Sequence, residues 1–272
     1  INELPDLQAR IQVSLFNILQ EGDIQIRGFK LRLPLDILFI FTANPEDYTN
    51  RGSIVTPLKD RIESQIITHY PKTIEVSKAI TQQEARILPE QLETVEVPDM
   101  CRLLIEQLAM EARKSEFVDQ KSGVSARLTI SAYENLVSTC ELRAIQSNQP
   151  HTMMRIADFI GVIPSITGKI ELVYEGEQEG PLNVAHRLMG QAIRSLFTKY
   201  FPDPQSFKKA KNIPQQKLHT EKTKAMANPY QPIIDGFGKG NGLTLLQNEP
   251  DEAYLVHLYK VDGLDAGIKQ YN

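Results

Sequence analysis

Apolar residues in the first part of the chain follow two different spacings. Between Pro5 and Gln20 they recur every three or four residues, which predicts a helix. Apolar and polar residues alternate on both sides of Arg27-Gly28, which predicts a short β-hairpin. The run ILFIFTAN, residues 37–44, is apolar at nearly every position. Such a run is typical of a central parallel strand that is covered on both faces.

A polar loop follows this run and leads into PLKDRIESQIITHYP, residues 57–71. The pattern there predicts a short helix and then a second strand at Gln65–Thr68. Strand, loop, helix and strand together form a fragment of an α/β fold. A parallel sheet needs more strands than residues 1–71 supply, so we expect that the upstream half of this domain is absent from the sequence.

Helical spacing prevails from Ser77 onward. The tail after Phe201 is rich in Pro, Gly, Lys and Asn, which is typical of a linker or a wrapping arm. The sequence therefore predicts an α/β fold in three parts, namely a partial parallel-sheet core over residues 1–75, an all-helical domain over 76–200 and a C-terminal extension over 201–272. The helices expected after the core include Arg127–Gln146, His151–Ile163, Pro181–Tyr200 and one within DEAYLVHLYKV, residues 251–261.

Composition narrows the classes of protein. Of the 272 residues 41% are hydrophobic and 24% charged, as in ordinary globular domains. A net charge of −4 does not provide the positive field that binds nucleic acid, and we interpret the basic stretch 208–224 as a linker. No window approaches the roughly 18 consecutive apolar residues of a membrane span, and no leader pattern opens the chain. We therefore expect a cytoplasmic protein without a membrane partner.

Cysteine usage agrees with this location. Cys101 and Cys140 lie far apart and have no metal-binding spacing around them. The sequence therefore predicts two buried thiols in a reducing compartment, and neither a disulfide framework nor a zinc site.

Polar residues that follow the predicted strands are the first candidates for chemistry. Asn44 ends the apolar run, at the edge where open α/β sheets bind ligands, and its amide could orient a water or a phosphate oxygen. Asn2-Glu3 occupies a second predicted strand end, where a carboxylate could polarise an attacking water. The alternatives stay open at this point: an asparagine that begins a loop, and a helix cap followed by a first-turn glutamate.

Two arginines are further candidates. Arg61 follows the short helix and offers a fork that suits phosphate oxygens, although an exposed arginine is usually solvated or part of a weak salt bridge. Arg127 opens a long helix, with Ser125 as a candidate N-cap. Because the helix dipole disfavours a cation there, Arg127 suggests a nearby anion.

The order of these parts resembles the second half of an AAA+ ATPase core with its lid, in the MoxR and magnesium-chelatase-subunit-I branch. INELPDL looks like the end of a Walker B strand, and DIQIRGFKLRLPLD is similar to a presensor-1 hairpin. FTANPEDYTNRGSIVTPLKDRI resembles sensor 1 followed by the arginine-finger segment, and GVSARLTISAYENL resembles a sensor-2 helix. The resemblance covers about residues 1–200, and it implies a partial P-loop-type core with a helical lid.

This resemblance implies an ATP hydrolase that uses ATP and Mg²⁺. Glu3 would activate the water that attacks the γ-phosphate, and Asn44 would position that water. Arg61 would reach the nucleotide of a neighbouring identical subunit in a ring, and Arg127 would contact the nucleotide of its own subunit. Asn2 would stand at the metal-supporting position. The ring would remodel a protein substrate, or would act with a VWA-type partner in metal insertion.

Two departures from the family pattern are visible. Asn2 stands where an aspartate usually supports Mg²⁺. No G-x-x-x-x-G-K-[ST] occurs, and GFGKGNG, residues 236–242, has the wrong spacing and is predicted to be a turn. We therefore expect the chain on its own to be inactive. Two alternatives are an enhancer-dependent transcription activator, which should carry a helix-turn-helix, and a non-hydrolysing AAA+ scaffold, which Asn2 favours.

Overall fold

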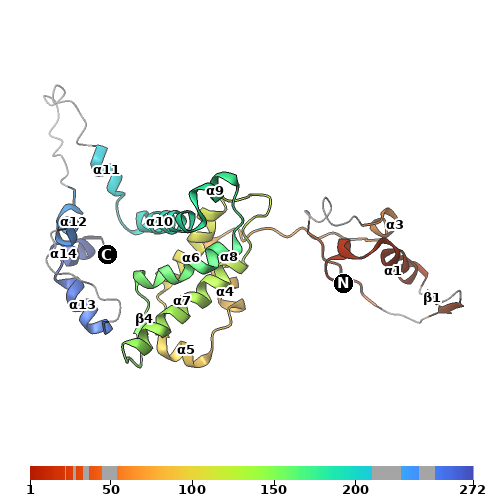
Figure 1. The fold of residues 1–272 in the computed structure, drawn as a ribbon, viewed down its shortest axis with the longest axis horizontal. Coiled ribbons are helices and arrows are strands. Elements are labelled where there is room, and N and C mark those ends of the chain that lie inside the picture. Colours follow the sequence, from red (N-terminus) through yellow and green to blue (C-terminus); the bar gives the residue numbers. More distant parts are fainter. Residues whose placement is uncertain are drawn as a thin grey trace, which may run out of the picture. The chain divides into compact units, whose positions relative to one another are not determined.

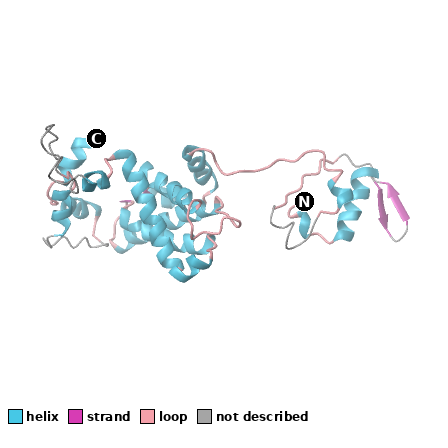
Figure 2. Ribbon diagram, turned by 90° about the horizontal axis from the view of Figure 1, so that it is seen from above, coloured by secondary structure: helices cyan, strands magenta, loops and turns pink. Residues whose placement is uncertain are grey.

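The computed structural model describes residues 1–21, 23–26, 29–32, 37–44, 54–209, 228–238 and 249–271. The chain divides into two compact units, Ile1–His69 and Tyr70–Asn272 (Figure 1). Helices make up most of the described residues, and the longer strands form a hairpin in the first unit (Figure 2). The finer division of the second unit at residue 200 stays a prediction.

The first unit consists of short elements. The hairpin predicted around Arg27-Gly28 is confirmed, because its two strands pair antiparallel. The predicted first helix is confirmed from Ala9 onward, whereas its expected first turn is a separate 3-10 helix that ends where Leu7 adopts an extended conformation. The elements are η1 (Leu4–Asp6), α1 (Ala9–Glu21), β1 (Asp23–Ile26), β2 (Phe29–Arg32) and α3 (Thr56–Lys59).

A small core joins these elements. Leu4 of η1 and Leu58 of α3 are fully buried. Gln12 of α1 is buried beside them, and its amide donates to the Leu7 carbonyl at 2.9 Å and accepts from the Val55 amide at 2.8 Å. A buried side-chain amide thus finds backbone partners on both of its polar ends, and it ties α1 to the segments on either side.

Residues 37–44 run beside the chain start without forming a β-strand. Ile1 N donates to Ile40 O at 2.8 Å, Thr42 N to Ile1 O at 3.0 Å, and Leu4 N to Thr42 O at 2.9 Å, a slanted pattern typical of parallel pairing. The Ile40 side chain is 68% exposed. The prediction of a central strand covered on both faces is therefore wrong, because such a strand needs a neighbour on each side and a covering layer.

The predicted strand at Gln65–Thr68 is also wrong. These residues form no strand, and the side chains of Ile66 and Ile67 are 90% and 80% exposed. A strand is stable only where a neighbouring chain completes the ladder of backbone hydrogen bonds. Within the described residues of the first unit no such neighbour pairs with this segment.

The second unit is almost entirely helical. The predicted helices Arg127–Gln146 and Pro181–Tyr200 are confirmed at both ends as α7 and α10. The helix predicted within residues 251–261 is confirmed as α13, but it is not the last one, because α14 follows it. The other elements are α4 (Ile74–Glu84), α5 (Pro89–Thr94), β3 (Val95–Glu96), α6 (Asp99–Ala112), β4 (Thr152–Met153), η2 (Ile156–Val162), α8 (Ile163–Lys169), α9 (Tyr174–Glu179), α11 (Pro204–Lys209), α12 (Gln231–Gly238), α13 (Asp251–Tyr259) and α14 (Leu264–Tyr271).

Other predictions for this unit are wrong or lie partly outside the described residues. The predicted helix His151–Ile163 is wrong, because its first part is β4, which pairs in parallel with β3, and the rest is the 3-10 helix η2. The glycine-rich segment 236–242 was predicted to be a turn, which is wrong for residues 236–238 because they belong to α12. The rest of this segment lies outside the described residues. Most of the basic stretch 208–224 lies outside them as well.

The core of the second unit is built around α7. Leu128, Ala132 and Leu136, four residues apart, are fully buried, so one face of this helix points inward. Helices α4, α5, α6 and α8 and the 3-10 helix η2 pack against α7, and α10 packs on α6. Apolar side chains at helical spacing thus explain the fold of this unit.

A buried carboxyl lies in this core. Glu106 of α6 accepts hydrogen bonds from the hydroxyls of Ser77 and Thr81 on α4. Burial raises the pKa of the Glu106 carboxyl above its ordinary value, although the two hydroxyls act in the opposite direction. The charged form of this carboxyl is therefore disfavoured in the folded state.

This arrangement predicts how stability depends on pH. A carboxyl whose pKa is raised by folding stabilises the folded state fully below its unfolded pKa, and that contribution is lost as pH rises through the folded pKa. Glu106→Gln removes this titration. We therefore expect the free energy of unfolding of the variant, relative to the natural protein, to increase from pH 4 to pH 7 by about 1.4 kcal/mol per unit of pKa shift.

Urea unfolding at several pH values measures this difference. Glu90→Gln, at an exposed carboxyl of α5, is the matched control and should follow the natural protein throughout. Parallel pH curves for Glu106→Gln and the natural protein would contradict the prediction.

Candidate functional site

The structure brings Glu3 and Asn44 together. The Asn44 side-chain amide donates to the two carboxylate oxygens of Glu3, at 3.2 Å and 3.4 Å. Glu3 ends the segment that begins at Ile1, and Asn44 ends the parallel-paired run 37–44. Both side chains therefore lie at the carboxyl end of neighbouring parallel segments, which is the edge where α/β folds bind ligands.

Thr42 joins Asn2 to the same site. Its hydroxyl oxygen accepts from the Glu3 amide at 3.0 Å and its hydroxyl group donates to the Asn2 side-chain oxygen at 2.5 Å. Glu3 has φ 53° and ψ 57°, a left-handed conformation that is uncommon outside glycine, and the Thr42 hydrogen bond holds its amide in place. Sequence reasoning missed Thr42, although a residue two positions before Asn44 lies on the same face of extended chain.

The chemistry open to this group is acid–base catalysis and the binding of an anionic oxygen. A carboxylate can accept a proton from water, and an amide N–H can hold the oxygen of that water or of a phosphate. The oxygens of Asn2, Glu3 and Thr42 are of the hard kind that Mg²⁺ prefers. No group of three or more His, Cys, Asp or Glu that could hold a metal occurs among the residues described.

Arg61 follows α3 and is held on its own unit. Its Nε donates to the Gln20 side-chain oxygen at 2.8 Å, and its Nη1 donates to the Pro57 carbonyl at 2.8 Å. The guanidinium carbon lies 4.0 Å from the centre of the Phe16 ring. These partners belong to α1 and α3, so Arg61 does not join the Glu3–Asn44 pair.

Arg127 is the first residue of α7, in the second unit. Its side chain is exposed, and across the described part of the chain its guanidinium makes no hydrogen bond or ion pair. The N-cap is Ala126, not the expected Ser125, whose hydroxyl instead accepts from the Arg127 amide at 3.3 Å. A cation without a partner thus stands at a helix N-terminus, where the dipole disfavours it.

Comparison of the chain with protein-family models, with curated proteins and with solved structures gives no match. The described helices include none with the length and apolar character that a membrane crossing requires. The functional interpretation therefore rests on the residues of this chain and their geometry.

The role of Thr42 in positioning Glu3 is testable. Thr42→Val keeps the shape of the side chain but removes the oxygen that accepts from the Glu3 amide. We expect the Glu3 amide to exchange with solvent about fivefold faster in this variant, because a hydrogen bond of about 1 kcal/mol is lost. Hydrogen exchange followed by NMR measures this rate.

Thr42→Ser, which keeps the hydroxyl, is the control and should retain the natural exchange rate. Full protection of the Glu3 amide in Thr42→Val would show that the hydroxyl does not hold it.

Proposed function

We propose that this chain is the hydrolytic part of an AAA+ ATPase of the MoxR and magnesium-chelatase-subunit-I type. The observation that carries the proposal is the Asn44–Glu3 hydrogen bond at the ends of two parallel-paired segments. A carboxylate and an amide adjacent at such an edge have the chemical groups needed to activate and orient a water. Asn2 and Thr42 add oxygens beside them.

In this proposal Glu3 accepts the proton of the attacking water as that water approaches the γ-phosphate. Asn44 holds the Glu3 carboxylate in one orientation, and its amide also hydrogen-bonds the water or a phosphate oxygen. Mg²⁺, held by the phosphates and by the oxygens around Asn2, would neutralise charge on the phosphates. The 272 residues contain no P-loop, so the triphosphate cradle is not supplied by these residues.

The contacts of Arg61 support its role as an arginine finger. They occupy Nε and Nη1 and leave Nη2 without a partner among the described residues. Packing on Phe16 fixes the plane of the guanidinium, and a fixed guanidinium stabilises transition-state charge without reorganisation. Because its partners separate Arg61 from Glu3, we propose that it serves the site of a neighbouring subunit in a ring.

Arg127 fits the remaining role. An exposed cation at the start of α7 is stabilised when an anion approaches, and a nucleotide phosphate of the same subunit supplies such an anion. Binding would then couple the helical unit to the state of the nucleotide. The ring would use this motion to remodel a partner protein or to assist metal insertion.

A second candidate is a non-hydrolysing scaffold with the same fold. Asn2 favours it, because a neutral oxygen that already accepts from Thr42 supports a metal less well than a carboxylate does. The two candidates differ in whether the full-length protein hydrolyses ATP.

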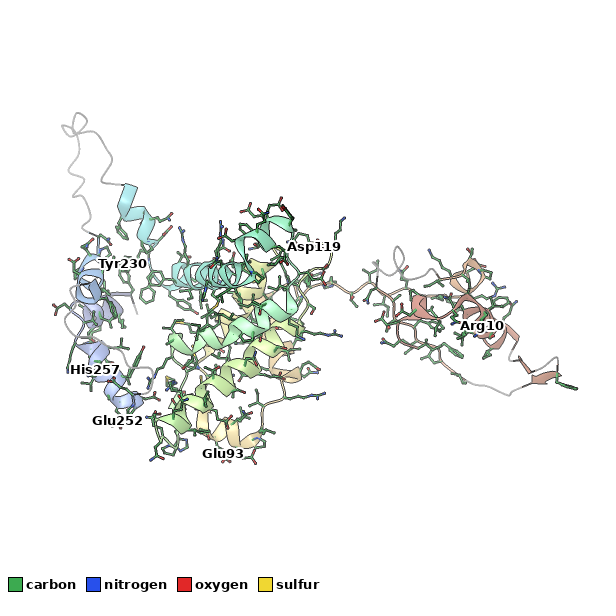
Figure 3. All side chains as sticks on the ribbon, viewed as in Figure 1. Arg10, Glu93, Asp119, Tyr230, Glu252 and His257 are labelled. Atoms are coloured by element: carbon green, nitrogen blue, oxygen red, sulfur yellow. The ribbon has the colours of Figure 1, made fainter. Side chains whose placement is uncertain are left out.

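The finger role of Arg61 predicts the effect of one substitution. In the full-length protein, Arg61→Ala should lower the rate of ATP hydrolysis by about 10³-fold or more while nucleotide binding is kept. Steady-state phosphate release and nucleotide titration measure the two quantities. Arg10→Ala, at an exposed arginine of α1, is the matched control and should change neither (Figure 3). Loss of nucleotide binding in Arg61→Ala would mean that Arg61 is structural.

Mixing two inactive variants tests whether the finger acts between subunits. Glu3→Gln subunits still supply Arg61, and Arg61→Ala subunits still supply Glu3. If the finger acts on a neighbour, rings assembled from both variants should regain hydrolysis, because some interfaces contain both groups. No recovery in mixed rings that assemble normally would contradict action between subunits.

A further inference from the structure

A buried arginine lies at the end of α7 in the second unit. Arg143 is 5% exposed, and its Nε and Nη2 each donate to Asp158 of η2 at 2.9 Å. Its Nη2 also donates to the Met153 carbonyl at 2.8 Å, and its Nη1 to the Thr152 hydroxyl at 2.7 Å. Arg155, which is 7% exposed, lies beside this group. We use the name arginine socket for the side chains of Arg143, Arg155 and Thr152 together with the backbone amide of Met153.

The carboxylate of Asp251, the first residue of α13, fills the socket. Its Oδ1 accepts from Arg143 Nη1 at 3.1 Å and from Arg155 Nε at 3.0 Å and Nη2 at 2.5 Å. Its Oδ2 accepts from the Thr152 hydroxyl at 3.1 Å and from the Met153 amide at 2.8 Å. Both oxygens are therefore bound by donors that the folded body presents, which is the geometry of a carboxylate receptor.

The charges of the socket require an anion at this place. Arg143 and Arg155 are balanced by Asp158 and Asp251. Burial acts to raise the pKa of the Asp251 carboxyl, but hydrogen bonds from the Met153 amide, Arg155 and Thr152 outweigh it and lower the pKa. Without Asp251 both buried guanidinium groups lose a carboxylate partner, which is strongly unfavourable.

By contrast, the apolar side of α13 contributes little to its attachment. None of its residues is buried, and the side chains of Leu255 and Tyr259 are 50% and 66% exposed. Beneath the helix lies a pocket of about 820 Å³, which Leu255 and Leu258 line together with residues of β3 and β4. Tyr254 packs its ring against the Arg155 guanidinium at 4.2 Å. The Asp251 carboxylate, together with the hydrogen bond that Arg155 Nη2 donates to the Glu249 carbonyl at 2.6 Å, therefore contributes more to the attachment of α13 than the apolar side of this helix does.

We propose that the arginine socket is a recognition site for a carboxylate that begins a helix, that α13 occupies it within the same chain, and that an acidic helical peptide competes for it. The competing peptide is the α13 segment of a second copy of this chain, because that segment carries the carboxylate, the aromatic ring and the leucines that contact the socket and the pocket. The preferred ligand has an aspartate at its first turn, an aromatic residue three positions later and leucines facing the pocket. This inference is independent of the ATPase proposal.

Substitution on the ligand side leaves the buried arginines in place. Asp251→Asn in the full chain removes the charge of the ligand, and Glu252→Gln, at the adjacent exposed carboxylate of α13, is the matched control (Figure 3). The probe is a fluorescein-labelled peptide of residues 249–261, titrated into each variant and followed by fluorescence anisotropy. Light scattering gives the molecular mass of each variant.

We expect the Asp251→Asn chain to bind the probe at least about tenfold more tightly than the natural chain and Glu252→Gln, whose sockets are occupied. The same peptide with asparagine in place of its aspartate should bind about tenfold more weakly or worse. Hydrogen exchange of residues 251–259 should be faster in Asp251→Asn only.

Two results would overturn the proposal. One is equal binding of the probe by all three chains, or binding by none while α13 of Asp251→Asn keeps its protection from exchange. The other is a fall in mass on Asp251→Asn, which would place the α13 of a second copy in the socket and so refute occupation within the same chain.

Discussion

The burial of α7 is the interaction on which the second unit depends. Leu128, Ala132 and Leu136 place one face of this helix in the core, and α4, α5, α6, η2 and α8 pack against it. The same packing carries Arg143 out of water near the end of the helix. A buried guanidinium is stable only when it is paired, and Arg143 forms ion pairs with Asp158 and Asp251. The burial of α7 thus explains both the apolar core and the buried ion pairs of the arginine socket.

The spacing of apolar residues predicted helices well, because the hydrogen bonds of a helix join residues that are close in the sequence. The helices α7 and α10 were located to the residue, because helical spacing and sequence breaks coincide at their ends. The strand β4 was missed because its partner, β3, lies far earlier in the chain, and two paired residues leave no periodic signal. The run 37–44 has the apolar composition of a covered strand, but composition does not supply the neighbours that would cover it.

In the candidate site, too, some residues could be placed from the sequence and others could not. Glu3 and Asn44 could be placed together because both follow predicted parallel segments, and the ends of such segments meet at one edge. Thr42 was missed, although the alternation of extended chain puts it on the Asn44 side. Asp251 could not have been found this way, since 108 residues separate it from Arg143 and nothing local marks an aspartate as the ligand of a distant arginine.

The fully buried thiol of Cys140 lies next to the Arg143–Asp158 ion pair. Its Sγ donates to Asp158 Oδ2 at 3.5 Å, and burial raises the pKa of this thiol well above its ordinary range. The prediction of two buried thiols is confirmed for Cys140 but wrong for Cys101, which is only partly buried and whose pKa burial raises to about 11. Because the thiolate is the nucleophile, alkylating reagents attack Cys140 only when α7 and η2 separate. The rate at which an alkylating reagent adds its mass to Cys140 therefore reports how often this part of the core opens.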